Sequence, residues 1–485
     1  MSRHQLFIDG RWQDGTGESD ILLINPATEL PFGSVASAGV EQIDRALASA
    51  QRSFEAWRTM RPAKRAEILK DAALRFAELT GPDLEQVFTK QQGKTLAESR
   101  GELARAVEMF EWTAAQADHP FEVDYSLPNR KRVAYPKPIG VVAAFTPWNY
   151  PAVLIVRKVI SGLAAGCTVV LKAAEEVPAP AIAIVRALQE AGVPDGAVNL
   201  LFGDPAAISD QLLSSPITRK MSFTGSTQVG KLLAEKASKN LIRSTLELGG
   251  HAPVLIFEDA DIGAAAASIA EYKFECAGQS CNAPSRIYVQ DRVFPQFLEA
   301  LATETAKIKV GDGCDPTVTM GPLQHRRRLD AVKALFRDAV RRGAKVVTGG
   351  ERESGPGYFF GPTLLTELAD DAEILAQEPF GPILPLIQFS STAEAIEKAN
   401  RTPYGLAGYV FTKSEDLADE ILTQLAVGYA SVNCMSGVPA DAPVGGVRDS
   451  GYGLEGGLRG IEEYLHPQLV TFVGGFDSAH PPERS

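Results

Sequence analysis

The chain of 485 residues lacks both a cysteine-rich framework and a long apolar run. A transmembrane helix needs about 18 or more consecutive apolar residues, and no stretch offers them. The start, MSRHQLFIDGRW, reaches Asp9 and Arg11 before a signal-peptide core could form. The sparse, odd set of five cysteines indicates reduced thiols and a cytoplasmic protein: Cys167, Cys276, Cys281, Cys314 and Cys434.

An excess of positive charge and the usual metal-binding motifs are also missing. With 48 basic and 60 acidic residues, the net charge of −12 would repel nucleic acids and anionic membranes. The six histidines are scattered, and neither HExxH nor CxxC occurs, so no metal site is predicted. At 45% hydrophobic and 22% charged residues, the composition is that of a globular chain with more than one domain.

The apolar pattern changes character along the chain. From Val40 to about Phe121 the spacing is helical, whereas residues 121–139 alternate and contain three prolines, which predicts an extended arm. From Gly140 to about 250, short β-branched runs alternate with helical segments, including 151–165. This alternation predicts a doubly wound parallel sheet with ligands at the carboxyl ends of its strands.

A second α/β stretch follows from about 252 to 445 and contains Cys281. The run PQLVTFVGG near the end predicts an isolated strand, which would pair with the arm at 121–139 or with another subunit. The tail SAHPPERS predicts a frayed end.

One thiol and one carboxylate stand beside small residues that would let a ligand approach. Cys281 lies in FECAGQSCNAPSR and Glu247 in LELGGHAP. A thiolate adds to an aldehyde carbonyl, and a carboxylate can activate the water that later releases the product. A single cysteine is more often a small core residue, and a single glutamate more often a surface charge. The motifs around them therefore decide between the two interpretations.

Two segments of the alternating region have features of a dinucleotide site. FTGSTQVGK places Gly225, Ser226 and Gly230 between a strand and a helix, where backbone N–H groups can approach a pyrophosphate. In LKAAEE, Lys172 and Glu175 could bind the adenosine ribose, and the glutamate would repel the extra phosphate of NADP. The alternatives are a tight turn in the first segment and a surface ion pair in the second.

Seven motifs occur in one order along the chain: PWNYP (147–151), LKAAEE, FTGSTQVG, LELGG, FECAGQSC, EPFGP (378–382) and PVGGVRDSGYG (443–453). Together they resemble the aldehyde dehydrogenase superfamily. VRKVISGLAAGCTVVLK and APVGGV are most similar to its succinate-semialdehyde dehydrogenase-like branch.

The resemblance implies an α/β subunit with a doubly wound Rossmann-type cofactor domain, a second α/β catalytic domain and a β oligomerisation arm. The NAD-binding domain would comprise residues 1–120 and 140–250 with part of 446–463, and the catalytic domain residues 251–445. Residues 121–139 and 464–485 would form the arm of a homodimer or homotetramer.

The resemblance also implies a role for each matching residue. Cys281 would be the nucleophile, Glu247 the general base and Asn149 a donor of the oxyanion hole, with Lys158 and Glu455 in a proton relay. The cofactor, NAD in preference to NADP, would contact Trp148, Lys172, Glu175, Gly225, Ser226, Gly230, Leu248, Glu378 and Phe380.

The substrate site departs from this branch. The arginine common six residues before the nucleophile is Glu275 here, and the asparagine usual at the next position is Cys276, which we expect to be a buried apolar cysteine. Arg157 matches the branch's other substrate arginine. Glu275 would oppose a substrate carboxylate unless it pairs with Arg157 or points away.

The predicted reaction is NAD-dependent oxidation of a small aldehyde to its acid through a cysteine thioester. The preferred substrate is succinate semialdehyde or a related semialdehyde. The alternatives are an aminoaldehyde or aromatic aldehyde dehydrogenase, a CoA-acylating semialdehyde dehydrogenase and a non-catalytic crystallin-like protein.

Overall fold

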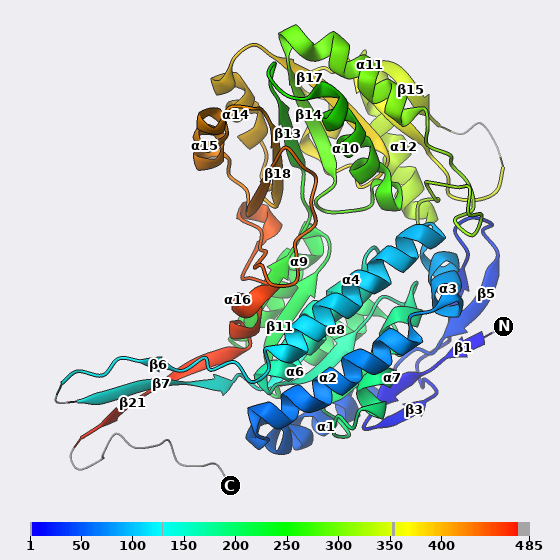
Figure 1. Ribbon diagram of the computed structural model, residues 1–485. Helices are drawn as coiled ribbons and strands as arrows, with labels where there is room; N and C mark the ends of the chain where they lie inside the picture. Colours follow the sequence, from blue (N-terminus) through cyan, green and yellow to red (C-terminus); the bar gives the residue numbers. More distant parts are fainter. Residues whose placement is uncertain (1, 129, 352–354, 474–485) are drawn as a thin grey trace.

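The computed structural model describes residues 2–128, 130–351 and 355–473 (Figure 1). The tail SAHPPERS, with the rest of 474–485, lies outside the described residues. Two lobes, each built on its own sheet, face one another, and a thin β arm projects from the lower one. None of the described helices is long and apolar enough to cross a membrane.

The predicted helical segment after Val40 forms a group of helices on one side of the lower lobe (Figure 1). Gly93, at φ +99°, ends one of them, and a capping box starts the next, in which Thr95 Oγ1 accepts from Glu98 N and Glu98 Oε2 accepts from Thr95 N. The helices are α1 (Val40–Thr59), α2 (Pro62–Leu79), α3 (Pro82–Gln92) and α4 (Leu96–Ala115).

The sheet of the lower lobe has eight strands within the described residues, in the order β20-β12-β11-β8-β9-β10-β2-β3. Its central strands are parallel and run β8 (Val141–Phe145), β9 (Thr168–Lys172), β10 (Val198–Leu201), β11 (Thr218–Thr224) and β12 (Arg243–Glu247). The chain builds outward from β8 in one direction and then in the other, so the strand order reverses between β8 and β11. Ligands of doubly wound sheets bind outside the carboxyl ends at such a point.

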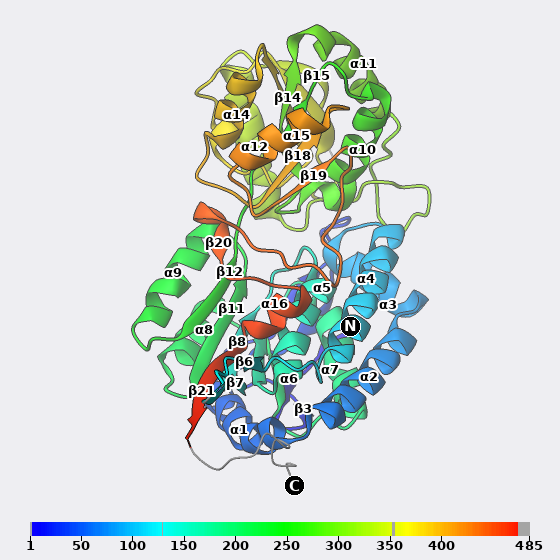
Figure 2. The same ribbon diagram turned by 60° about the vertical axis from the view of Figure 1, so that its left-hand side comes forward.

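Antiparallel strands complete this sheet at both edges. They are β2 (Leu6–Ile8), β3 (Arg11–Gln13) and β20 (Gly451–Tyr452). Figure 2 shows β20 and the late helix α16 (Gly457–Glu462) beside this lobe. A separate small sheet contains β1 (Ser2–His4), β4 (Ile21–Ile24) and β5 (Pro31–Val35).

The helices between the parallel strands are α7 (Pro178–Glu190), α8 (Pro205–Ser214), α9 (Thr227–Ser238) and an interrupted helix over 151–165. The sequence predicts this last segment as one continuous helix. Instead, a π turn, η1 (Val156–Ile160), separates α5 (Pro151–Ile155) from α6 (Ser161–Ala165). Such wide turns are frequent at functional sites.

The upper lobe confirms a second α/β region. Its sheet has the order β15-β16-β17-β14-β13-β18-β19, antiparallel only between β15 and β16. The strands are β13 (Ala252–Ile256), β14 (Pro284–Gln290), β15 (Lys345–Gly350), β16 (Gly361–Thr366), β17 (Ile383–Phe389), β18 (Ala407–Phe411) and β19 (Tyr429–Val432). The helices are α10 (Ile262–Phe274), α11 (Phe294–Thr305), α12 (Arg326–Arg341), α13 (Glu373–Ala376), α14 (Thr392–Asn400) and α15 (Glu415–Gln424). Short helical turns are η2 (Glu275–Gly278), η3 (Asp291–Val293) and η4 (Arg448–Ser450).

The projecting arm consists of β6 (Val123–Asp124), β7 (Lys131–Pro138) and β21 (Leu465–Phe472) (Figure 1). β21 pairs antiparallel with β7 along its whole length, so the late strand pairs with the arm of its own chain. Leu469 remains 60% exposed on this arm.

Candidate active site

A cavity of about 580 Å³ opens at the carboxyl ends of β8, β11 and β12, against the loop that leads into β14. Both lobes contribute to its wall. The predicted site residues that line it are Trp148, Asn149, Arg157, Gly225, Ser226, Glu247, Leu248, Glu275, Cys281, Glu378, Phe380 and Glu455. The other predicted residues, Lys158, Lys172, Glu175 and Gly230, do not line this cavity.

The loop that carries Cys281 is held in an unusual backbone conformation. Cys276 and Ala277 both have φ +52°, a left-handed conformation that costs energy for residues with a side chain. On the facing loop, a Cβ on Gly250 would lie only 2.1 Å from the carbonyl oxygen of Cys281. The second glycine of LELGG therefore allows the segment that begins with Glu247 to approach the loop that carries Cys281.

The Cys281 thiol is held in its protonated form by its surroundings. Burial raises its pKa to about 12, and the nearby Glu378 and Glu247 carboxylates contribute to this rise from its ordinary range. A thiol of this pKa reacts only when a neighbouring base takes its proton.

Glu247, the last residue of β12, is the candidate for this base. It is 8% exposed, and its Oε1 has no hydrogen-bond partner within the described residues. Burial and, after it, the charge of Glu455 raise the pKa of Glu247 well above its ordinary value. A carboxyl with a raised pKa is suited to general-base work near neutral pH.

Behind Glu247 lies a buried polar chain. Lys158, in the π turn η1, forms an ion pair with Glu455, and the two side chains are 0% and 3% exposed. Ser222 Oγ donates to Glu455 Oε1 at 3.2 Å and accepts from Lys158 Nζ at 3.3 Å. Glu455 also lines the cavity, so the chain connects its wall with the interior.

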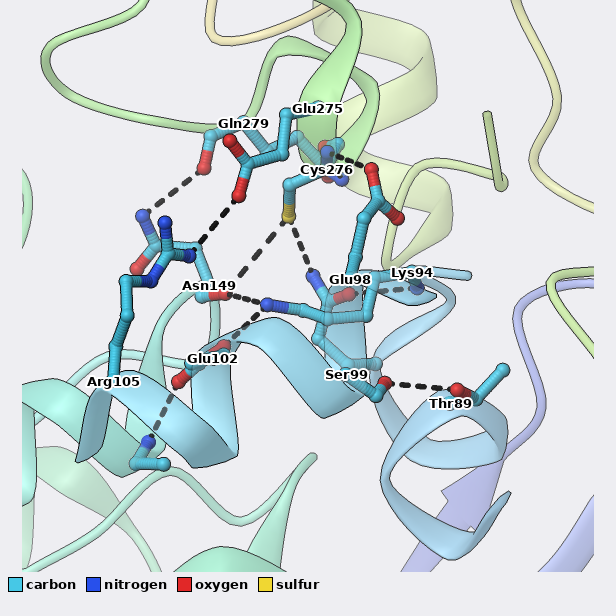
Figure 3. A network of polar contacts seen from close by, with 12 residues as sticks. Thr89, Lys94, Glu98, Ser99, Glu102, Arg105, Asn149, Glu275, Cys276 and Gln279 are labelled. Atoms are coloured by element: carbon cyan, nitrogen blue, oxygen red, sulfur yellow. Dashed lines mark hydrogen bonds and ion pairs between the residues drawn. The ribbon is translucent and has the colours of Figure 1, made fainter. Parts of the chain in front are cut away.

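Asn149 lies in the loop after β8 and lines the same cavity as Cys281. Its Nδ2 donates to the carbonyl oxygen of Gln279 at 3.0 Å, and its own backbone carbonyl accepts from Lys94 Nζ at 2.9 Å (Figure 3). An amide nitrogen carries two hydrogens. The bond to Gln279 uses one of them and leaves the second available in the cavity wall.

The strand-to-helix turn after β11 leads into the capped N-terminus of α9. Ser226 is the N-cap of α9, and its hydroxyl accepts from Val229 N at 3.4 Å. A Cβ on Gly230 would lie 2.3 Å from Leu248 Cδ2. Gly230, predicted as a cofactor contact, thus makes room for Leu248 to pack against α9, and Leu248 lines the cavity instead.

Lys172 and Glu175 form an ion pair just past β9. The spacing of three residues allows this contact, as the sequence indicated. Burial and the adjacent charge of Glu175 raise the pKa of Glu176. Two carboxylates therefore stand beside one lysine at this edge of the sheet.

Glu378 and Phe380, in the loop before β17, also line the cavity. Gly250 N donates to Glu378 Oε1 at 3.2 Å, and burial raises the pKa of Glu378 to about 8. The ring of Phe380 stands edge-on to Trp148, with 5.7 Å between centroids and an interplanar angle of 85°.

The partner of Glu275 is a residue that sequence reasoning missed. Glu275 neither pairs with Arg157 nor turns away; it lines the cavity, and Arg105 Nη2 donates to its Oε1 at 3.1 Å (Figure 3). Arg157 Nη2 donates to the carbonyl of Val438 at 3.3 Å, and no ion pair of Arg157 is found in the described ranges. Aromatic and apolar side chains complete this end: Met109, Tyr150, Val153, Tyr272, Tyr429 and Val438.

Cys276 is buried, as expected, but its surroundings are polar. Gln92 Nε2 donates to its sulfur at 3.1 Å, and the sulfur lies 3.8 Å from the carbonyl oxygen of Asn149. The prediction of an apolar environment was wrong, because the loop folds onto the polar ends of α3 and α4.

Comparison with known proteins agrees with this geometry. The model of the Aldehyde dehydrogenase family matches residues 12–470, and the chain belongs to that family. The 4-(hydroxymethyl)benzenesulfonate dehydrogenase TsaD1 of Comamonas testosteroni is 41% identical over 97% of this chain and 98% of its own. The succinate-semialdehyde dehydrogenase [NADP(+)] of Escherichia coli is 38% identical over 96% of this chain and 97% of its own.

The fold agrees equally well with solved structures. The crystal structure of succinate-semialdehyde dehydrogenase from Burkholderia pseudomallei superimposes with a TM-score of 0.95 at 37% identity, covering 97% of this chain and 98% of that one. The predicted fold class and family are confirmed.

Proposed function

We propose that this protein oxidises a small aldehyde with an anionic far end to the carboxylic acid, using NAD. The observation that carries the proposal is the convergence of Cys281, Glu247 and Asn149 on one cavity that also contains the N-terminal turn of α9. Succinate semialdehyde or a related semialdehyde is the preferred substrate.

The residues of the cavity fit a dinucleotide, together with the Lys172–Glu175 pair, which lies outside the cavity lining. The N-terminus of α9 and the small residues Gly225 and Ser226 offer backbone N–H groups to a pyrophosphate, and Lys172 with Glu175 offers partners for ribose hydroxyls. A Cβ on Gly249 would lie 2.7 Å from Glu378 Oε2, so this glycine leaves the carboxylate room beside the cavity. When bound, NAD supplies the hydride acceptor of the reaction.

In the first half of the reaction, Cys281 attacks the aldehyde carbon after Glu247 takes the thiol proton. The new C–S bond turns the carbonyl oxygen into an alkoxide, which the free N–H of Asn149 Nδ2 and the backbone N–H of Cys281 stabilise. Loss of hydride from this carbon leaves a thioester on Cys281.

Before the second half, Glu455 and Lys158 carry the thiol proton away from Glu247. Glu247 then takes a proton from water, and the resulting hydroxide attacks the thioester. The C–S bond breaks, the acid departs, and the Cys281 thiolate takes the proton from Glu247 to regenerate the thiol. Because a base poised for water is of little use when a thiol is the acceptor, Glu247 disfavours the CoA-acylating alternative.

An anionic far end is supported by Arg157, whose guanidinium lines the cavity and pairs with no carboxylate among the described residues. The names of the similar proteins from Escherichia coli and Comamonas testosteroni refer to a carboxylate and a sulfonate, respectively. The tyrosines at this end favour an aromatic sulfonated or carboxylated aldehyde as the second candidate. Arg105 neutralises Glu275, which weakens the case for an aminoaldehyde.

The preference for NAD rests on Glu175, which would face the 2′-phosphate of NADP with like charge. The proposal also includes the domain boundaries given above. It further includes a homodimer or homotetramer joined through the arm, and a cytoplasmic location. The exposed Leu469 on the arm supports assembly, and light scattering in solution would test it.

Initial rates of NADH and NADPH formation test the proposal. We expect succinate semialdehyde or 4-formylbenzenesulfonate to have a higher kcat/KM than an aminoaldehyde or a plain alkanal, each with NAD above NADP. Absence of cofactor reduction with every aldehyde would favour the crystallin-like alternative. Turnover that requires CoA would overturn the hydrolytic step.

A further inference from the structure

A buried ion pair lies behind Asn149, outside the chemistry described above. Lys94, between α3 and α4, and Glu102, on α4, approach to 2.5 Å between Nζ and Oε2, and their side chains are 1% and 0% exposed. Two charges taken out of water lose hydration that their mutual attraction often fails to offset, so a buried ion pair is weak evidence for stability. The other hydrogen bonds of the two side chains therefore explain the ion pair better than a contribution to stability.

Both charged groups hold the segment 149–152. Lys94 Nζ donates to the carbonyl oxygen of Asn149 at 2.9 Å, and Glu102 Oε1 accepts from Ala152 N at 2.8 Å. The Lys94 ammonium also lies 4.3 Å from the centroid of the Tyr150 ring. Hydrogen bonds with a charged partner are the stronger kind. The start of α5 is thus fixed on both sides of the ion pair.

The same helix holds the loop of the nucleophile. Cys276 N donates to Glu98 Oε1, on α4, at 2.8 Å, and Asn149 Nδ2 donates to Gln279 O in this loop (Figure 3). Buried carboxylates of α4 therefore connect to both partners of the oxyanion site, through Glu102 to Asn149 and through Glu98 to the segment before Cys281.

We propose that Lys94 and Glu102 are positioning residues that fix the Asn149 amide relative to the Cys281 sulfur. This inference rests on the proposed function, in which Asn149 donates to the alkoxide. Oxyanion donors act because they are held in place before the charge develops. A misplacement of about 1 Å costs on the order of 100-fold in rate.

The double variant Lys94→Met/Glu102→Gln tests the proposal without leaving an unpaired buried charge. The amide oxygen that replaces the carboxylate at position 102 can still accept from Ala152 N, so the variant mainly removes the donor to Asn149 O. We expect NAD affinity and KM to change less than about threefold. The rate of the first NADH burst should fall roughly 10- to 100-fold, with a larger isotope effect for the aldehyde deuterated at its carbonyl carbon.

Controls separate positioning from a general loss of structure. Arg100→Gln, on α4, breaks an ion pair with Glu85 in which the arginine side chain is 69% exposed, and it should leave the burst unchanged. If the double variant does not fold, the pH dependence of the burst in the single variant Glu102→Gln tests the positioning role. Burial works to lower the pKa of Lys94, but the opposing charges of Glu102, Cys276 and Glu98 raise it above its ordinary value. Without the charge of Glu102 we expect this pKa to fall. The burst rate of this variant should then fall as pH rises, unlike that of the wild type.

The variant Asn149→Ala distinguishes the oxyanion role of Asn149 from the positioning role of Lys94 and Glu102. A slow burst in Asn149→Ala, together with a burst within twofold of wild type in the folded double variant, would overturn positioning alone. A burst at the wild-type rate at every pH in Glu102→Gln would also overturn the positioning role. A normal burst in Asn149→Ala would overturn the oxyanion role itself and with it the positioning.

Discussion

Arg105 on α4 and Glu275 after α10 form an ion pair across the wall of the cavity, with 3.1 Å between Nη2 and Oε1. Their side chains are 44% and 25% exposed, so the pair stands at the water-accessible part of the wall. The guanidinium also lies 5.8 Å from the centroid of the Tyr150 ring. A glutamate that would repel an anionic substrate is therefore compensated by a cation from the other lobe.

Cys281→Ala should abolish turnover and leave the Kd for NAD within about twofold. The proposed mechanism places the covalent intermediate on this thiol, whereas the proposed cofactor contacts lie on other elements. Stopped-flow NADH formation and fluorescence titration measure the two quantities. Activity within tenfold of wild type would show that another group attacks the aldehyde.

Glu247→Gln should slow both halves of the reaction, because the proposed mechanism uses Glu247 first to take the Cys281 proton and then to activate water. We expect the NADH burst and the steady-state rate each to fall by about 10²- to 10⁴-fold. Rapid mixing with excess aldehyde makes both phases visible. A burst at the wild-type rate followed by a slow steady state would mean that Glu247 activates only the hydrolytic water and that another group takes the Cys281 proton.

The same variant should be more stable than wild type at neutral pH. Burial raises the pKa of Glu247 in the folded protein above its ordinary value of 4.5. Between pH 4.5 and this raised pKa, the folded protein therefore binds more protons than the unfolded chain. Wild-type stability then falls with rising pH, by about 1.4 kcal/mol per unit of pKa difference. Denaturation midpoints should differ little below pH 4.5 and diverge above it. A constant difference at all pH values would contradict this origin.

Glu175→Gln should narrow the preference for NAD. The substitution removes the charge that would face the 2′-phosphate and releases Lys172 from its ion pair. We expect the NAD/NADP ratio of kcat/KM to fall on the order of tenfold, equivalent to about 1.4 kcal/mol. The exposed Lys64–Glu67 pair has the same spacing, and Glu67→Gln is the matched control. A wild-type enzyme that prefers NADP would contradict the interpretation of LKAAEE.

Of the candidate site, the sequence indicated the parts that lie in short contiguous motifs at strand ends. Gly225 follows β11 and Glu247 ends β12, and parallel strands bring such ends to one edge of a sheet. Arg105 could not be predicted, because it stands on a helix among ordinary charged residues and meets Glu275 only when the two lobes face one another. Lys94, in the turn between α3 and α4, and Glu102, on α4, likewise stand among polar residues typical of a solvated surface.

The π turn was missed for a different reason. The segment 151–165 is almost uniformly apolar, and its pattern contains no signal for one additional residue per turn. The widened turn holds Arg157 and Lys158, consecutive residues that serve different ends of the site: Arg157 lines the cavity, whereas Lys158 reaches Glu455 behind it. Tertiary contacts, and not the local helix propensity, determine the backbone conformation of this turn.

The choice of substrate should depend on Arg157 and on the Arg105–Glu275 pair. If Arg157 binds the far anion, Arg157→Ala should raise the KM for succinate semialdehyde about 10- to 100-fold more than that for an alkanal of similar length. Only the semialdehyde loses a charge-assisted hydrogen bond, worth about 1.5 to 3 kcal/mol.

Glu275→Gln should lower the KM for anionic aldehydes, since it frees the Arg105 guanidinium, and Arg105→Met should raise it by leaving the Glu275 charge unpaired. In both variants the KM for the alkanal, which is the internal control, should stay within about twofold of the wild-type value. Comparison of succinate semialdehyde with 4-formylbenzenesulfonate then distinguishes the two anions, since the longer aromatic aldehyde should depend more on Arg105. If all three variants leave the ratio of kcat/KM for anionic over neutral aldehydes unchanged, the cavity does not recognise an anion, and a neutral aromatic aldehyde against Tyr272 and Tyr429 becomes the better substrate.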